Sequence, residues 1–442
     1  MLLNAAISQN TLTATITPKN AAECSYVCYP GDSNLFSDEE ILASGTSVTA
    51  TASTTVTLED LEYETPYTIA VAVRNQAEAT SSTSLTLVTG KSPYSSAGDP
   101  ANTHIVSNAG AYSFETKKVG GAQIENIAEV DWIWATKIDE SDTQQRLISD
   151  LAYADGKVTF TATGERGNAV IAAFDASGNI VWEWLIWCTE QPEEMEYGSG
   201  SVFLDRAIGA TSADPADGTK TWGDILYQWG RPTPFFSGYV DEWGDSQAFN
   251  EARKWTVMNP RYNLSWHTDK RSVSIPEAIA NPTTFFADQT TYDWFNGNDL
   301  TRWGEEKTDY DPCPAGYRIP SSDDWGTLID ELTFDEDGDY ATYTYNGKTA
   351  YFPSQNSGRM YDTGENIIGH AGFTYYNCNV ILFDSMGFIA AGMLTEEQAI
   401  AMGYASYEVT RTHKTFKHGT VGGSRAVANR SFAFSIRCVK IR

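Results

Sequence analysis

The stretch DPCPAGYRIP, residues 311–320, decides the fold of the C-terminal half of this 442-residue chain. Cys313 lies between two prolines that restrict its backbone. Cys438 lies about 125 residues later in FSIRCV, where it shares one face of a period-2 strand pattern with Phe434 and Ile436. A bond between the two thiols would close a whole domain and would contribute roughly 4 to 5 kcal/mol at most.

Two motifs upstream extend this pattern. They are FLDRAIGA at 203–210 and ILYQWGRPTPFF at 225–236. With the two cysteine segments, they resemble the C-type-lectin-like domains of Bacteroidetes surface proteins, known as the Fibrobacter succinogenes major paralogous domain, over about residues 198–442. The resemblance implies an α+β lectin-like fold, a Cys313–Cys438 disulfide and an exported protein. Its expected location is the cell surface or outer membrane, on a lipid anchor, although the first residues show no export signal.

The N-terminal part alternates apolar and polar residues over short runs, as in TLTATIT and YTIAVAV, which predicts β-sandwiches. LEDLEYETPYTIAVAV resembles the corner of a fibronectin type III domain, with Leu61 in the core and Tyr67 bonded back to the chain. We therefore expect a multidomain, mainly β protein. It has a fibronectin type III-like sandwich at 1–91 that acts as a spacer, a linker at 92–102, a second β-sandwich at 103–192 and a C-type-lectin-like domain at 197–442.

Two local patterns refine this organisation. Trp182 and Trp184 share one face of a predicted strand and Trp187 lies on the other, so both faces of that strand should be covered. Capping patterns at Ser321–Asp324 and Thr395–Gln398 predict two helices within the lectin-like domain.

Charge and apolar content limit the partners. The formal net charge of -28 repels nucleic acids and anionic membranes, and no run of 18 apolar residues predicts a transmembrane helix. A glycan, a surface protein or other pilus subunits fit better as partners. The remaining cysteines have no evident disulfide partner. We interpret Cys24 and Cys28 as apolar residues of a strand, and Cys188 and Cys378 as buried free thiols.

Neither a metal site nor a cofactor site is predicted. The calcium-binding triplets of calcium-dependent lectins are missing from the lectin-like part. The acidic run 335–339 is followed by Tyr340 where a calcium loop needs glycine, and by Asn346 where it needs glutamate. The five histidines show no metal-ligand or nucleophile spacing, so we predict no catalytic residues and no enzyme.

Aromatic residues interleaved with amides and charges form the candidate ligand site. Such residues suit sugar rings and protein surfaces, and they equally suit a core beneath loops. Both alternatives stay open for Trp294, Asn296, Asn298, Asp299, Arg302 and Trp303 in one segment, and for Trp222, Trp229 and Arg231 in another.

These expectations favour a non-enzymatic, adhesin-like or fimbrial tip-like protein that recognises a glycan or protein through aromatic-rich loops of its C-terminal domain. A glycan-processing enzyme or its accessory subunit is one alternative. A purely structural pilus subunit is the other.

Overall fold

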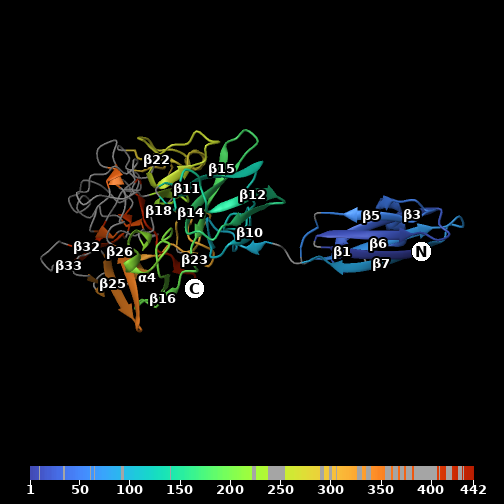
Figure 1. Ribbon diagram of the computed structural model, residues 1–442, viewed down its shortest axis with the longest axis horizontal. Helices are drawn as coiled ribbons and strands as arrows, with labels where there is room; N and C mark the ends of the chain where they lie inside the picture. The colour runs from blue at the N-terminus through green and yellow to red at the C-terminus, as the bar shows by residue number, and fades with distance from the viewer. Residues whose placement is uncertain are drawn as a thin grey trace. The chain divides into compact units, whose positions relative to one another are not determined.

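A computed structural model of the chain shows a multidomain protein made mainly of β-strands, as predicted (Figure 1). It describes residues 1–221, 225–236, 254–288, 293–297, 301–325, 331–334, 340–353 and 431–442, except residues 9, 33, 34, 60, 64, 91–93, 140, 305 and 432, together with short strands between 360 and 426. The chain forms two compact units, Met1–Pro93 and Tyr94–Arg442.

The first unit is a sandwich of two antiparallel sheets around one apolar core. The smaller sheet has the order β1 (Leu2–Ser8), β2 (Thr11–Thr17) and β5 (Thr54–Leu58). The larger sheet has the order β4 (Thr46–Ser47), β3 (Glu23–Pro30), β6 (Pro66–Arg74) and β7 (Thr80–Val88).

Period-2 alternation explains the core of this unit. Leu12, Ala14 and Ile16 of β2 point inward, and they meet Ile69 and Val71 of β6 in one cluster. The predicted corner is also present: Leu61 packs against the core, and the Glu62 backbone N–H donates to the Tyr67 hydroxyl at 3.3 Å. The corner prediction is therefore confirmed in its geometry.

A helix covers the outer face of the larger sheet, which the sequence analysis did not predict. Helix α1 (Asp38–Ser44) begins at a capping box in which the Glu40 N–H donates to the Ser37 hydroxyl and Glu40 reaches back to the Ser37 N–H. Its Ile41 packs on Ala70 and Ala72. Strand β6 is consequently buried on both faces, and this explains its nearly continuous apolar run.

The second unit begins with two sheets that share the largest apolar core among the described residues. The first has the order β12 (Ile148–Ala154), β13 (Lys157–Ala162), β10 (Gly110–Glu115) and β8 (Ser95–Ser96). The central sheet has the order β20 (Thr256–Met258), β11 (Glu129–Thr136), β14 (Gly167–Phe174), β15 (Ile180–Cys188) and β9 (Thr103–Val106).

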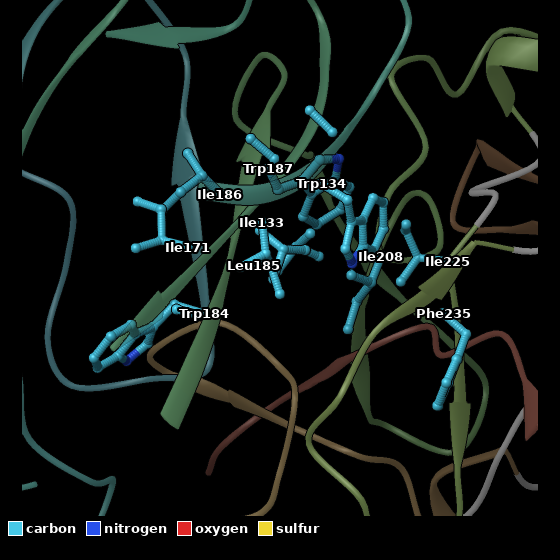
Figure 2. Packing of buried hydrophobic residues seen from close by; sticks show 14 of the residues in the cluster. Ile133, Trp134, Ile171, Trp184, Leu185, Ile186, Trp187, Ile208, Ile225 and Phe235 are labelled. Atoms are coloured by element: carbon cyan, nitrogen blue, oxygen red, sulfur yellow. The ribbon is translucent and has the colours of Figure 1, made fainter. Parts of the chain in front are cut away.

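The central sheet is covered on both faces, as the parity of its tryptophans predicts. Figure 2 shows Trp184 on one side of the strands and Trp187 on the other. Trp184 meets Phe114 of the first sheet, with ring centroids 5.2 Å apart, whereas the Trp187 indole N–H donates to the Ala210 carbonyl at 2.9 Å. The core therefore continues from the predicted second sandwich into the C-terminal region.

This shared core crosses two of the expected boundaries. Strand β20 belongs to the predicted lectin-like part, yet it pairs with β11 at one edge of the central sheet, and Pro314 makes a β-bridge to Thr103 in β9 at the other edge. Residues 103–192 and 197–442 thus lie in one compact unit. The predicted linker 92–102 includes strand β8 and the buried Ala97 and Ala101, so most of it is part of this unit.

The C-terminal region, residues 194–442, is built from many short strands. Its sheets comprise β16 (Glu194–Glu196), β17 (Val202–Leu204), β35 (Val439–Lys440) and β23 (Tyr317–Arg318); β19 (Phe235–Phe236), β18 (Ile225–Gln228) and β34 (Ala433–Phe434); β21 (His267–Asp269) and β22 (Thr284–Phe286); β24 (Thr333–Phe334), β25 (Tyr340–Tyr345) and β26 (Lys348–Pro353); β27 (Met360–Tyr361) and β28 (Ile367–Ile368); β29 (Phe373–Thr374), β32 (Val409–Lys414) and β33 (Val421–Ala426); and β30 (Ile381–Leu382) and β31 (Ser406–Tyr407).

The helical elements here are short. They include the 3-10 segment η1 (Pro215–Thr221), α3 (Ile275–Ala280) and α4 (Ser322–Trp325). The predicted cap of α4 is present, because the Asp324 N–H donates to the Ser321 hydroxyl at 3.2 Å. The helix expected after Thr395 lies outside the described residues. The C-type-lectin-like assignment of this region therefore stays a prediction.

The segment DPCPAGYRIP is a junction between distant parts of the chain. A disulfide joins Cys313 to Cys438 with 5.9 Å between their Cα atoms. The buried Asp311 carboxylate accepts from the backbone N–H groups of Cys313 (2.8 Å) and Ile319 (2.9 Å) and from the Lys307 ammonium (3.1 Å). The Asn102 side-chain amide donates to the Asp311 carbonyl at 2.9 Å, which ties the turn to the central sheet.

The other cysteines that the structure describes are free thiols. Cys24 and Cys188 are buried, and Cys28 is half-buried. Cys378 lies outside the described residues.

We expect the double variant C313A/C438A to lose up to roughly 5 kcal/mol of the free energy of unfolding of the second unit, because the bond closes a long loop. All 13 tryptophans lie in this unit, so the urea midpoint followed by tryptophan fluorescence reports on it alone. Cys28→Ala in the first unit is the control and should leave that midpoint unchanged. An unaltered midpoint in the double variant, or recovery of both thiols free from the non-reduced protein, would contradict the pairing.

Candidate functional site

The structure buries three of the four tryptophans of the candidate ligand site, Trp229, Trp294 and Trp303, and brings them together. Trp229 and Trp294 are fully buried, and Trp303 is 2% exposed. The Trp294 indole N–H donates to the Trp229 carbonyl at 2.8 Å, and that of Trp303 donates to the Tyr310 carbonyl at 2.9 Å. A ligand cannot reach these rings in this structure. Of the two alternatives left open, the structure places these side chains in the core.

The two arginines of the predicted site are buried among the same rings. The Arg302 guanidinium carbon lies 4.0 Å from the Phe295 ring centroid, 4.9 Å from that of Trp294 and 5.1 Å from that of Trp229. Such cation–π contacts strengthen when water is excluded. Arg302 therefore stacks with the buried aromatic cluster and is not presented at the surface.

Arg231 is fully buried and donates all five of its guanidinium N–H groups to oxygens. The acceptors are Thr233 Oγ1 (3.0 Å), Gln228 Oε1 (2.9 Å) and the carbonyls of Thr284 (3.0 Å), Ala278 (2.7 Å) and Asn281 (3.0 Å). A cation that is satisfied so completely orders the loops around it, and it has no donor left for a ligand.

The other predicted site residues do not complete a surface site. Asn296 is exposed, and Trp222, Asn298 and Asp299 lie outside the described residues. The sequence-based proposal of aromatic-rich binding loops is therefore corrected for five residues. The side chains that form core instead are those of Trp229, Arg231, Trp294, Arg302 and Trp303.

A buried carboxyl group adjoins Arg231. Glu183, on β15, is 2% exposed, and its Oε1 accepts from the Thr233 hydroxyl, which itself accepts from Arg231. Burial raises the pKa of Glu183 to about 7, although the Thr233 hydrogen bond and the Arg231 charge oppose the shift. The sequence analysis missed this group because a single glutamate within a Trp-rich strand carries no motif.

A pocket on the C-terminal region is the best candidate for ligand binding. It lies between η1 and the hairpin of β25 and β26, which turns at Asn346–Gly347, where both residues have positive φ. Its volume is about 150 Å³, well above the roughly 15 Å³ that one water requires. Its lining comprises Asp205, Arg206, Ala207, Ser212, Ala213, Pro215, Gly218, Thr221, Tyr340, Tyr351, Pro353 and Arg437.

Strand alternation separates the pocket from the core. Ala341 and Tyr343 of β25 face inward and are buried, with Ala350 and Phe352 of β26. Three residues of the opposite parity line the pocket, namely Tyr340, Tyr351 and Pro353, and the two tyrosine rings meet edge to face with centroids 5.6 Å apart. The period-2 pattern of YATYTY and KTAYFP was the sequence signal that could have identified these tyrosines.

Charged groups line the opposite wall. Both oxygens of Asp205 accept from Arg206, from Nε at 2.8 Å and from an Nη at 2.9 Å. Arg437 is 1% exposed and donates to the Tyr351 carbonyl (2.9 Å), the Tyr197 hydroxyl (3.3 Å) and the Asp205 carbonyl. This pocket, called the tyrosine pocket below, thus combines two tyrosine rings with a fixed carboxylate and two guanidinium groups.

A second cleft of about 630 Å³ is a weaker candidate. Its walls include Ser199, Lys307, Arg318 and Asp324, and no aromatic side chain lines it. Two of its charged groups are paired within the protein: Lys307 bonds Asp311 at 3.1 Å, and Arg318 bonds Asp324 at 2.7 Å. The cleft lacks the aromatic surfaces that the tyrosine pocket offers to a ligand.

The residues that the structure describes contain no group of three or more His, Cys, Asp or Glu side chains placed to hold a metal ion. Within the same ranges, no helix has the length and apolar character needed to cross a membrane.

Comparisons with known proteins give only weak likenesses. No family model matches the chain, and no curated protein matches it. Among solved structures, SporoSAG from Toxoplasma gondii is 10% identical, with a TM-score of 0.17 over 42% of this chain and 84% of that one. SGBP-B of the Bacteroides ovatus mixed-linkage glucan utilization locus, in complex with a mixed-linkage heptasaccharide, is 14% identical, with a TM-score of 0.13 over 40% and 39%. The FN1-FN3 domains of chicken CNTN1 are 12% identical, with a TM-score of 0.17 over 46% and 73%. We base no functional argument on similarities this low.

The buried carboxyl group makes stability depend on pH. The folded-state pKa of Glu183 is raised from 4.5 to about 7. The contribution of this group to the free energy of unfolding is therefore full below about pH 4.5, declines as the pH rises to about 7, and stays low above that. We expect Glu183→Gln, which keeps the hydrogen bond to Thr233 without the charge, to raise stability at pH 8 relative to wild type, by up to about 3 kcal/mol. Urea midpoints at pH 4.5 and pH 8 measure the effect. The exposed Glu125→Gln is the control, and an equal effect of Glu183→Gln at both pH values would contradict the assignment.

Proposed function

We propose that this protein is a non-enzymatic, surface-exposed binding protein that takes a glycan in the tyrosine pocket of its C-terminal region. The observation that carries the proposal is the placement of Tyr340 and Tyr351 beside Asp205, Arg206 and Arg437 in one cavity. This site replaces the buried tryptophans as the place where aromatic side chains meet the ligand.

The chemistry of the pocket fits a sugar ring. Tyrosine rings provide apolar faces for the C–H surfaces of a sugar, and they lose little conformational entropy because they have few torsions. Carboxylate, guanidinium and hydroxyl groups at fixed positions supply the directional hydrogen bonds that orient a ligand in a small cavity. Asp205 and Arg206 hold each other in place, so this polar wall is formed before the ligand arrives.

The charged groups favour binding without turnover. Glycoside hydrolysis ordinarily requires two carboxyl groups, one of them able to give up a proton. Among the described residues, Asp205 is the one carboxylate in the lining, and both of its oxygens are engaged by Arg206. This supports a recognition role over the alternative of a glycan-processing enzyme.

The location is part of the same proposal. The Cys313–Cys438 disulfide supports an oxidising compartment outside the cytosol. The resemblance of the cysteine segments to Bacteroidetes surface domains supports a lipid-anchored, adhesin-like or fimbrial tip-like protein with a C-type-lectin-like scaffold. The first unit, whose core is complete within its own sandwich, would act as a spacer.

We expect Tyr351→Ala to weaken glycan binding at least tenfold, which corresponds to about 1.4 kcal/mol, because the variant removes one apolar wall of the pocket. The backbone carbonyl that Arg437 uses remains in place. The measurement is a glycan array with the full chain, followed by calorimetric titration of the best ligand. Tyr153→Ala changes a half-buried tyrosine of β12 outside the pocket lining, and it is the matched control.

Two outcomes would contradict the proposal. One is a glycan whose affinity is the same for wild type and Tyr351→Ala. The other is the absence of binding to every glycan tested while the protein remains folded by tryptophan fluorescence.

A further inference from the structure

The wall of the tyrosine pocket contains a guanidinium group, that of Arg437, which pairs with no carboxylate among the described residues. Two guanidinium groups and one carboxylate line the cavity. The carboxylate of Asp205 is committed to Arg206, which also pairs with Glu190. Among the described residues, the acceptors of Arg437 are a hydroxyl and two backbone carbonyls, all of them uncharged.

Arg437 is also incompletely satisfied. Its Nε is buried and has no hydrogen-bond partner among the described residues. Its guanidinium carbon lies 4.2 Å from the Phe352 ring centroid, so one face of the group is covered by an aromatic ring. Buried charges in proteins are ordinarily paired, because an ion removed from water without a counter-ion is costly. Within the described part of the chain, Arg437 therefore has no paired anion.

The position of Arg437 is rigid, which makes the charge a useful recognition element. The residue precedes Cys438, whose disulfide fixes the backbone, and its donors bridge Tyr351 of the hairpin and Asp205 opposite. A cation held in a low-dielectric wall acts on a nearby anion more strongly than a solvated lysine does.

We infer that the tyrosine pocket selects glycans that carry an anionic group, a carboxylate or a sulfate, with Arg437 as the specificity-determining cation. The inference rests on the proposed function, since it names the class of glycan for the same pocket. The ligand charge lies against the wall that holds Arg437 and offsets its charge through that wall, while Tyr340 and Tyr351 contact the sugar ring.

The overall charge of the chain distinguishes this selection from general attraction of polyanions. With a formal net charge of -28, the protein repels an anionic glycan at long range. Salt screens that repulsion beyond about 10 Å at 0.1 M, but it screens a contact in a buried wall much less. Binding of an acidic glycan should therefore be maintained or strengthened as salt rises to 0.15 M, whereas nonspecific binding of a polyanion weakens.

The test uses matched pairs of acidic and neutral glycans with the full chain. The pairs are tri-galacturonic acid and its methyl ester, sialylated and desialylated lactosamine, and sulfated and unsulfated lactosamine. We expect the acidic member of at least one pair to bind at least tenfold more tightly. The acidic-to-neutral affinity ratios of the uronate and sialate pairs are compared with that of the sulfate pair. This comparison shows whether a carboxylate or a sulfate is preferred.

Variants assign the effect to the pocket. Arg437→Met removes the charge at similar length and should bring the acidic-to-neutral affinity ratio close to one, while Arg437→Lys should keep part of the preference. Tryptophan fluorescence verifies that each variant is folded. If Arg437→Met does not fold, the wild-type ratios and their salt dependence still decide the anionic preference, and a ratio unchanged in Arg437→Lys overturns the role of Arg437.

The outcomes separate the two proposals. Equal binding of both members of every pair, abolished by Tyr351→Ala, overturns the anionic selection and leaves the glycan-binding proposal standing. Failure of every acidic and neutral glycan to bind overturns both. Preference for the acidic members that persists unchanged in a folded Arg437→Met variant overturns the role of Arg437.

Discussion

The turn around Cys313 holds the second unit together because it is bonded in three directions at once. Its sulfur is joined to the last strand region, the Asp311 carboxylate closes the turn through two backbone N–H groups, and Asn102 and Thr103 attach it to the edge of the central sheet. A buried carboxylate that accepts several hydrogen bonds is a stable anchor, because its charge is offset locally. The position of Arg437, which directly precedes Cys438, follows from this junction. The covalent tie and the wall of the candidate site therefore share one structural cause.

The aromatic and cationic residues that drew attention in the sequence serve the interior. Arg231 is surrounded by five oxygen acceptors and Arg302 by three aromatic rings, and both lie within a region of short strands and irregular loops. A region with little regular secondary structure leaves many backbone carbonyls without partners inside a helix or sheet. Guanidinium groups satisfy such carbonyls and fix the loops. This explains why tryptophan and arginine cluster here without forming a surface.

The candidate site arises instead on the outer face of a hairpin. The same alternation that buries Tyr343 and Phe352 turns Tyr340 and Tyr351 toward η1, and the core residues keep those rings in place. The pocket lining holds two guanidinium groups and one carboxylate within a strongly acidic protein, so the preference proposed for it depends on Arg437 and its surroundings and not on the overall charge. Recognition through such a wall depends on the packing behind it, which is why the core and the proposed function are linked.

Local patterns in the sequence were sufficient for the mainly β architecture, the sandwich of the first unit, the Tyr67 corner, the cap of α4, the two covered faces of β15 and the cysteine pair. Each depends on a short period, a capping motif or a recognisable segment. The tertiary structure alone decided that β20 and Pro314 flank the central sheet and that α1 covers β6. It also decided that Trp229, Trp294 and Trp303 lie inside and that Glu183 lies beside Arg231. The physical reason is that burial in loop-rich regions is set by contacts between residues far apart in the chain, and no periodicity records which face of an irregular segment meets which distant partner.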